Sequence, residues 1–184
     1  SYASVINEYA AENIQLPSWS NVGMLGCYTL MRHQRQIGNQ QKDIDYGKIK
    51  KQLISFADDL IANGGNQAFK TIMGQNKKDY IWGSNAVALN QSIALINAFL
   101  ISNTRKYLDA ALSNMDYVLG RNATGYCFVT GIGTISPKHI HHRPSQADQI
   151  AEPVPGLLAG GPNPGREDKC QYLFTETETS YIDS

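Results

Sequence analysis

The sequence predicts an all-α fold followed by a long irregular segment. Up to about residue 120, apolar residues recur at spacings of three and four, which is the period of an amphipathic helix. No stretch in this part alternates between apolar and polar residues as a half-buried strand does. Beyond about residue 126 the periodicity ends, and Gly and Pro become frequent. We therefore expect successive antiparallel helix pairs and then loops.

Helix-breaking residues divide the helical part of the sequence into separate predicted helices. Residues 1–14 already have helical character, and a second helix is predicted over 19–34. Gly23 and Gly26 weaken that helix, and close packing against another helix is a common reason to keep glycine inside one. A third helix is predicted over 46–65, because its apolar residues gather on one face. They are Ile49, Leu53, Phe56, Ala57, Leu60 and Ile61.

Two further apolar helices follow. Residues 84–102 can begin at a Ser84 or Asn85 cap, since both side chains accept hydrogen bonds from a first helical turn. Apolar residues surround this helix almost completely, which is typical of a buried helix. Residues 104–120 return to a one-sided pattern that Gly120 closes. The predicted core face of this last helix is Leu108, Leu112, Met115 and Leu119.

Composition narrows the range of partners. The chain has 184 residues, enough for one domain or part of a larger one, and its formal net charge is zero. The chain therefore has no excess of positive charge that would favour binding to nucleic acid. Charged residues are only 17% and tyrosine occurs ten times, which suits a neutral polar ligand. The three cysteines lie far apart, which disfavours a disulfide framework. We see no signal peptide and no apolar run of about 18 residues, so no membrane partner is expected.

The segment 131–165 is rich in Gly and Pro, as in EPVPGLLAGGPNPG. A segment this long without regular structure is either disordered or a functional surface loop. Disordered segments are hydrophilic and highly charged, whereas this part of the chain carries apolar residues. They are Phe128, Val129, Ile132, Ile140, Val154, Leu157 and Leu158. We therefore expect ordered loops over one end of a helical scaffold.

Three histidines and an arginine lie close together in SPKHIHHRPS, residues 136–145, where two prolines exclude a helix. His139, His141 and His142 are suitable metal ligands, although no Cys or acidic residue adjoins them as a further ligand. A polar loop whose imidazoles bond to the backbone is a second interpretation. A third is recognition of a sugar or other polyol, because Arg143 offers a rigid fork of donors and neutral imidazole offers one donor and one acceptor.

The stretch DYVLGRNATGYCFVTGIGTISPKHIHHRPS, residues 116–145, resembles the histidine signature of glycoside hydrolase family 9, the inverting cellulases and endoglucanases. That signature ends in an apolar residue followed by His-x-Arg, as in Ile140 to Arg143. Cys127 and Ile135 depart from the usual signature, and neither position carries a chemical group of the site. WGSNAVALNQ, AEPVPGLLAGGPNPG and SYIDS resemble further family motifs in the same order and spacing.

The resemblance implies an (α/α)6 barrel, in which two rings of helices carry a cleft formed by loops at one end. Residues 1–184 would form the C-terminal portion, about half, of a single catalytic domain. Helices would extend to about residue 120, and active-site loops would occupy 121–184. The implied reaction is hydrolysis of β-1,4-glucosidic bonds in cellulose or related β-glucans with inversion, and the implied location is secreted or periplasmic.

The groups that transfer protons in this family are expected outside the chain. The general acid is a glutamate shortly beyond the aspartate that Asp183 matches, and the sequence stops at Ser184. The base belongs to an Asp-Ala-Gly-Asp-like motif near the family's N-terminus, which Asp58-Asp59 resembles only superficially. We therefore expect the chain to be inactive alone and to have the missing N-terminal part of the same enzyme as its partner.

The resemblance also implies roles for individual residues. His141 and Asp183 are expected in the catalytic centre, with His141 bonding a substrate hydroxyl and Asp183 lying beside the acid. Arg143 is expected to bind another hydroxyl, and Trp82 and Trp19 to stack on sugar rings. The alternatives are a turn or cap role for the aspartate and a core position for either tryptophan.

The resemblance implies no cofactor and no metal at the histidines, and structural calcium occurs in parts of the family. The Asn122-Ala123-Thr124 sequon is expected to be a structural turn and not a glycosylation site. The expected ligand is a β-glucan polysaccharide or oligosaccharide. Two alternatives come from other functional classes: a non-catalytic glucan-binding protein that kept the cleft and lost its carboxylates, and a metal-binding module.

Overall fold

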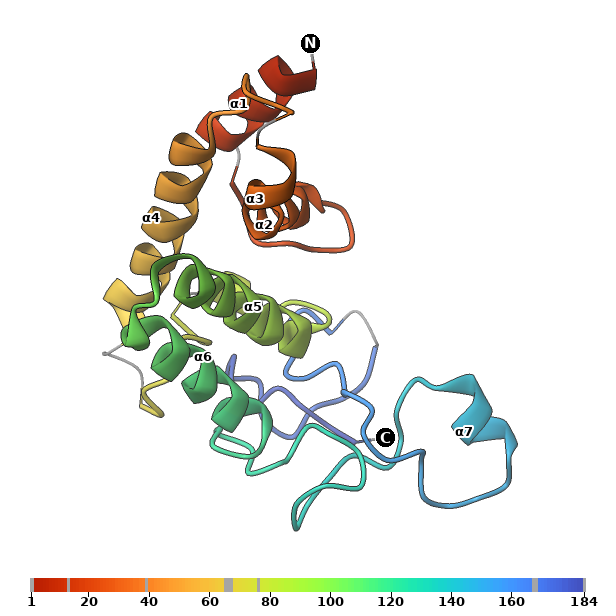
Figure 1. Ribbon diagram of the computed structural model, residues 1–184. Coiled ribbons are helices and arrows are strands. Elements are labelled where there is room, and N and C mark those ends of the chain that lie inside the picture. The colour runs from red at the N-terminus through yellow and green to blue at the C-terminus, as the bar shows by residue number, and fades with distance from the viewer. Residues whose placement is uncertain are drawn as a thin grey trace. The chain divides into compact units, whose positions relative to one another are not determined.

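The computed structural model describes residues 2–12, 14–38, 40–64, 68–75, 77–166 and 169–183 (Figure 1). The helices are α1 (Tyr2–Glu12), α2 (Gly23–Arg32), α3 (Gln34–Ile37), α4 (Tyr46–Gly64), the 3-10 helix η1 (Lys77–Asp79), α5 (Ser84–Ser102), α6 (Arg105–Val118) and α7 (Arg143–Ala147). Every regular element among the described residues is a helix and none is a strand, so the predicted all-α class is confirmed.

The chain forms two compact units. The first consists of Ser1–Asn63 and Asn90–Ala111, and the second of Gly64–Leu89 and Leu112–Ser184. Helices α5 and α6 each contribute residues to both units. All the loops that follow α6 belong to the second unit, which therefore contains the histidine stretch.

The apolar face of α4 forms the centre of the first unit. Ile49, Leu53 and Ala57 are buried there, and the partly buried Phe56 and Leu60 pack against the same core. This is the face that the apolar spacing predicts. The core is completed by residues that include Ala10 of α1, Met24, Cys27 and Tyr28 of α2, and Ala94 of α5.

The two glycines of α2 differ in their surroundings. A Cβ atom on Gly23 would lie 2.3 Å from the Tyr9 ring of α1, whereas a Cβ atom on Gly26 would meet nothing within 4 Å. The prediction of close packing is therefore correct for Gly23 and wrong for Gly26, which faces open space. The helix also begins later than predicted, because Ser18 and Asn21 close a turn ahead of it.

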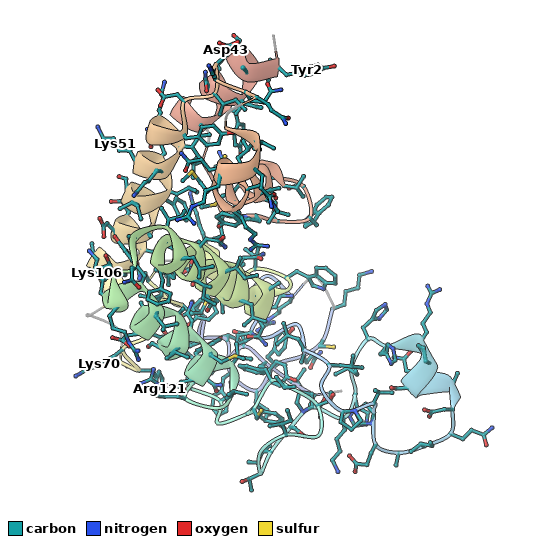
Figure 2. The ribbon with its side chains drawn as sticks, in the orientation of Figure 1. Tyr2, Asp43, Lys51, Lys70, Lys106 and Arg121 are labelled. Carbon is teal, nitrogen blue, oxygen red and sulfur yellow. The ribbon has the colours of Figure 1, made fainter. Side chains whose placement is uncertain are left out.

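Asp58 of α4 is bonded to α6. Its Oδ1 accepts hydrogen bonds from Lys106 Nζ at 2.6 Å and from the Tyr107 hydroxyl at 2.8 Å, and Lys106 is labelled in Figure 2. The bond from Lys106 is the main reason, and the bond from Tyr107 the next, that the pKa of the Asp58 carboxyl lies below its ordinary value. The Asp58 carboxylate thus serves a contact between helices, in line with its merely superficial resemblance to a catalytic motif.

An aromatic cluster forms the centre of the second unit. The fully buried Phe128 ring lies 5.9 Å from the Tyr117 ring and 5.1 Å from the Tyr181 ring, between centroids. Tyr126 extends the cluster, with its ring 5.2 Å from Tyr181 in an edge-on arrangement. Such tilted and edge-on pairs are the favoured geometry for aromatic rings. The cluster ties the end of α6 to the loops and to the last residues described.

The buried face of α6 differs from the predicted one. Leu112, Met115 and Leu119 are exposed. The buried positions are Tyr107, Ala111, Asn114, Tyr117 and Val118. Asn114 can be buried because its amide is bonded: its Oδ1 accepts the Met73 N–H at 2.7 Å, and its Nδ2 donates to Ala88 O at 3.1 Å. The spacing of apolar residues predicts that the leucines of α6 are buried, whereas the structure buries its tyrosines and a hydrogen-bonded asparagine instead.

Against the prediction of no apolar run of about 18 residues, α5 is the one described helix long and apolar enough, by length and composition alone, to cross a membrane. In this structure 44% of that stretch is buried, and core helices of soluble proteins have the same length and composition. The prediction of a buried helix is correct for one set of positions, Ala88, Ala94, Leu95 and Ala98. It is wrong for Ile93, Ile96 and Leu100, which are exposed.

We expect Phe128→Ala to lower the free energy of unfolding of this chain by about 3–5 kcal/mol, because it removes a buried ring and leaves a cavity. Phe174→Ala, at an exposed position of the same unit, should change it by less than about 0.5 kcal/mol. Urea unfolding measures both. Equal losses in the two variants would contradict the aromatic cluster as the core of the second unit.

Candidate functional site

A buried threonine joins the two loops that follow α6. The Thr130 N–H donates to Leu157 O at 2.9 Å, and the Thr130 C=O accepts the Gly156 N–H at 2.8 Å. Its hydroxyl donates to Val154 O at 2.6 Å and accepts the Leu157 N–H at 2.9 Å. Buried backbone groups need such partners wherever no regular ladder supplies them. The two loops that Thr130 joins are therefore ordered, as the sequence predicts for residues 131–165.

The start of α5 holds the second of these loops. The Asn85 N–H donates to Gly160 O at 3.0 Å, and Asn85 Nδ2 donates to Ala159 O at 2.9 Å. The Ser84 hydroxyl makes a longer bond of 3.4 Å to Gly160 O. A Cβ atom on Gly161 would lie 2.5 Å from the Asn85 side chain, so only glycine fits there. The side chains predicted as helix caps thus hold the loop.

Asn122 builds the turn after α6. Its Nδ2 donates to Tyr117 O at 2.7 Å and to Tyr126 O at 2.9 Å. Its Oδ1 accepts the N–H groups of Thr124 and Gly125, both at 3.0 Å. The residue is buried. The prediction of a structural turn is confirmed, and the amide is not accessible to a glycosylating enzyme in the folded chain.

Asp183 lies against the backbone of the histidine stretch. Its Oδ2 accepts the Lys138 N–H at 2.8 Å, and its Oδ1 accepts the His139 N–H at 2.9 Å. His139 Nδ1 lies 3.7 Å from Oδ2, and the Asp183 side chain is only 12% exposed. Burial, followed by the charge of Asp183, raises the pKa of the nearby Tyr181. The structure therefore brings the aspartate to the loop just before His141.

His142 caps the short helix α7, which lies in the light blue part of the chain (Figure 1). Its Nδ1 accepts the Ser145 N–H at 3.3 Å and lies 2.9 Å from the Ser145 hydroxyl oxygen, which accepts the Val154 N–H at 3.1 Å. The polar-loop interpretation is correct for this histidine. The prediction of no helix is wrong, because Pro144 lies in the first turn, where a missing N–H breaks no helical bond.

His141 and Arg143 remain available for a ligand. Both are exposed, and neither side chain has a hydrogen bond or ion pair within the part of the chain that the structure describes. The capping bonds of His142 hold the backbone between them. Two donor groups on a held loop can bond neighbouring hydroxyls of a sugar ring. Among the described residues, no three His, Cys, Asp or Glu side chains gather to hold a metal ion.

Both predicted aromatic platforms are surface residues. Trp82 precedes α5 in the second unit and is 68% exposed. Trp19 lies in the turn before α2 in the first unit and is 95% exposed. The alternative of a core position is therefore wrong for each of them in this structure. An exposed indole face is free to stack on a sugar ring, and the platform role itself stays a prediction.

Sequence patterns did not identify Thr130 and Ser145 as residues that hold the loops. The available signal was weak. Thr130 stands beside Gly131 in an apolar stretch, where a buried hydroxyl requires a partner. Ser145 ends the histidine stretch, but no local spacing indicates that it connects His142 to Val154.

The fold and the site together define a helical scaffold whose ordered loops present polar side chains suited to sugar hydroxyls. The family model for glycosyl hydrolase family 9 matches residues 1–184. The chain belongs to glycosyl hydrolase family 9, as its motifs predict.

Two relatives illustrate the match in sequence. The chain is 40% identical over 169 residues to the xyloglucan-specific endo-beta-1,4-glucanase of Bacteroides ovatus, an alignment that covers 91% of this chain and 29% of that protein. It is 36% identical over 150 residues to endoglucanase D of Acetivibrio thermocellus, which covers 82% of this chain and 23% of that protein.

Solved structures give the same result. The family 9 protein of Bacteroides ovatus has a TM-score of 0.83 and 37% identity, over 96% of this chain and 30% of its own. AaCel9A in complex with cellobiose-like isofagomine has a TM-score of 0.81 and 30% identity, over 99% of this chain and 34% of its own. These neighbours are (α/α)6 barrels, so the prediction of a partial barrel is confirmed. The chain spans about a third or less of the proteins it matches.

We expect Trp82→Ala to change the free energy of unfolding of this chain by less than about 0.5 kcal/mol, because the indole is exposed. Tyr80→Ala is the matched comparison, since Tyr80 is a buried aromatic residue of the same segment. It should lose about 3 kcal/mol or more. Thermal and urea unfolding report both variants, and a loss of about 3 kcal/mol in Trp82→Ala would show that Trp82 is core.

Proposed function

We propose that the whole protein hydrolyses β-1,4-glucosidic bonds in cellulose or a related β-glucan with inversion, and that these 184 residues help to hold the substrate. The observation that carries the proposal is the pair His141 and Arg143. Both are exposed and unpaired within the described residues, and both lie on a loop held by Asp183 on one side and by the His142 cap on the other. The pair matches the His-x-Arg of the family's signature.

The names of the relatives support a β-1,4-glucan as the substrate. They include a xyloglucan-specific endo-beta-1,4-glucanase, an endoglucanase and a cellulose 1,4-beta-cellobiosidase. A glucan chain offers hydroxyls at its edges and apolar ring faces, which suit the donors of His141 and Arg143 and the exposed indoles of Trp82 and Trp19. Because such a polymer does not enter cells, we place the protein in the periplasm or outside the cell.

Inversion requires a carboxylic acid that protonates the leaving oxygen and a carboxylate that activates water, with room for the water between them. In this proposal both groups come from parts of the whole protein outside the 184 residues. Inside the chain, Asp58 is bonded to Lys106 and Tyr107, and Asp183 is bonded to the loop backbone. The chain contributes binding and orientation of the sugar, and this acid–base chemistry needs no cofactor. A structural calcium ion stays a prediction.

We expect the isolated 184-residue chain to release no reducing sugar from a soluble β-glucan above background, because the acid and the base lie outside it. The whole protein at equal molarity should release reducing sugar, and NMR should show the α-anomer as the first product of inversion. Clear turnover by the pure chain would refute the placement of the acid and base. A whole protein that binds the glucan without cleaving it would favour the non-catalytic alternative.

In the whole protein, we expect His141→Ala and Arg143→Ala each to lower kcat/KM on a soluble β-glucan by roughly ten- to more than a hundredfold. Hydrogen bonds to a charged group such as Arg143 contribute about 1.5–3 kcal/mol, and a substrate hydroxyl left unpaired by the loss of His141 costs about 1–3 kcal/mol. Thr134→Ala, at an exposed position of a neighbouring loop, is the control and should keep wild-type kinetics. Normal kcat/KM in both variants, with unfolding curves unchanged, would remove them from the substrate site.

A further inference from the structure

We propose that Asp183 is a positioning residue whose carboxylate fixes the loop that presents His141 and Arg143, and that it transfers no proton itself. The catalytic part of this inference rests on the proposed function, whereas the contact that carries it is independent of activity. The sequence predicts Asp183 in the catalytic centre, beside the acid. The contacts of its two oxygens give it a specific task there.

Each carboxylate oxygen of Asp183 accepts one backbone N–H. Oδ2 takes the Lys138 N–H at 2.8 Å and Oδ1 takes the His139 N–H at 2.9 Å. Hydrogen bonds to an ionised acceptor are shorter and about twice as strong as neutral ones. The Asp183 side chain is mostly buried, so water competes poorly for these bonds. We call this pair of bonds the clasp.

The aspartate end of the clasp is anchored in the core of the second unit. Tyr181 packs edge-on against Phe128 and Tyr126, with ring centroids 5.1 Å and 5.2 Å apart. Phe128 is fully buried. The segment that carries Asp183 therefore cannot shift without disturbing packed rings. The clasp thus holds the loop at a fixed position relative to this core.

The loop is held again directly after the clasp. The Ile140 C=O accepts the His142 N–H at 2.8 Å and Gln146 Nε2 at 3.3 Å. His141 thus lies between the clasp on one side and the start of α7 on the other. Without the clasp, the chain directly before His141 would lose both of its backbone bonds to Asp183 and keep the exposed Lys138–Glu152 ion pair, so the imidazole would be held less firmly.

The chemistry of the clasp requires a carboxylate. An ionised carboxylate offers only acceptors, which suits two backbone donors side by side. An asparagine would keep one acceptor and turn an NH2 group toward the other N–H, so one amide would lose its partner. Each oxygen already accepts one N–H, and the side chain is mostly buried, so little room remains for water or a leaving group to reach this carboxylate.

The test uses the whole protein carrying Asp183→Asn. Hydrogen–deuterium exchange resolved to the Lys138 and His139 amides reports the clasp without depending on activity. We expect faster exchange at these two amides and a kcat/KM on soluble β-glucan lower by roughly ten- to a hundredfold, the range in which small misplacements of a site act. The pH values of half-maximal activity should stay where they are. Asp183→Glu, which keeps two acceptors and the charge, should recover part of the loss.

Glu152→Gln is the matched control. It removes the exposed carboxylate that lies 2.9 Å from Lys138 Nζ and leaves the backbone bonds of Lys138 in place, so exchange and kinetics should not change. Unchanged exchange at the two amides in Asp183→Asn would overturn the proposal. A lost or shifted limb of the pH profile would also overturn it, because Asp183 would then transfer a proton.

Two further outcomes are separated by the same measurements. Hydrogen exchange across α4 shows whether Asp183→Asn folds, and if it does not, Asp183→Glu is the deciding variant. Faster exchange at the Lys138 and His139 amides with an unchanged pH profile of activity supports the clasp. Unchanged exchange at these amides, or a shifted pH profile, overturns it. If the wild-type protein does not hydrolyse glucan, the proposed function fails, while exchange at Lys138 and His139 still decides whether the clasp exists.

Discussion

The segment that follows α6 has to pair its buried backbone groups, although its described residues contain no strand and one short helix, α7. The rest of the structure depends on how it does so. An unpaired buried donor or acceptor costs about 1–3 kcal/mol. Polar side chains supply the partners: Asn122 closes the turn after α6, Thr130 joins the following loops, and Asp183 binds the amides before His141. Each of them bonds at least two backbone groups, so a small number of residues holds a long segment.

The need to pair buried backbone groups also gives the residues of the histidine stretch different roles. His142 uses its ring to cap α7, and His139 contributes its amide to Asp183. The side chains of His141 and Arg143 are left without partners among the described residues. Residues that looked equivalent as potential ligands therefore divide into those that hold the loop and those that face outward.

The stretches that resemble the family's motifs contact one another in pairs. The start of WGSNAVALNQ bonds AEPVPGLLAGGPNPG through Asn85, and SYIDS bonds the histidine signature through Asp183. Such pairing gives a physical reason for their spacing along the chain, because a shift of one member would leave buried amides or carbonyls of the other without partners. The contacts between motifs are thus part of the scaffold on which the substrate side chains stand.

The sequence by itself determined the features that depend on neighbours along the chain. Spacing placed Ile49, Leu53 and Ala57 on the buried face of α4, and apolar content distinguished ordered loops from disorder after residue 126. The motif residues led to the family and to His141 and Arg143. Local patterns also failed in a consistent way: Leu112, Met115 and Leu119 are exposed, and Gly26 packs against nothing.

Only the tertiary structure decided the contacts between distant segments. Lys138 and Asp183, or Asn85 and Ala159, are far apart in sequence, and no periodicity links them. Whether a helix face is buried depends on what packs against it. Asn114 is therefore buried with its amide hydrogen-bonded, whereas the nearby Leu112 is exposed. The physical reason is that burial and hydrogen-bond pairing belong to three-dimensional neighbours, whereas propensity and periodicity report only the neighbours along the chain.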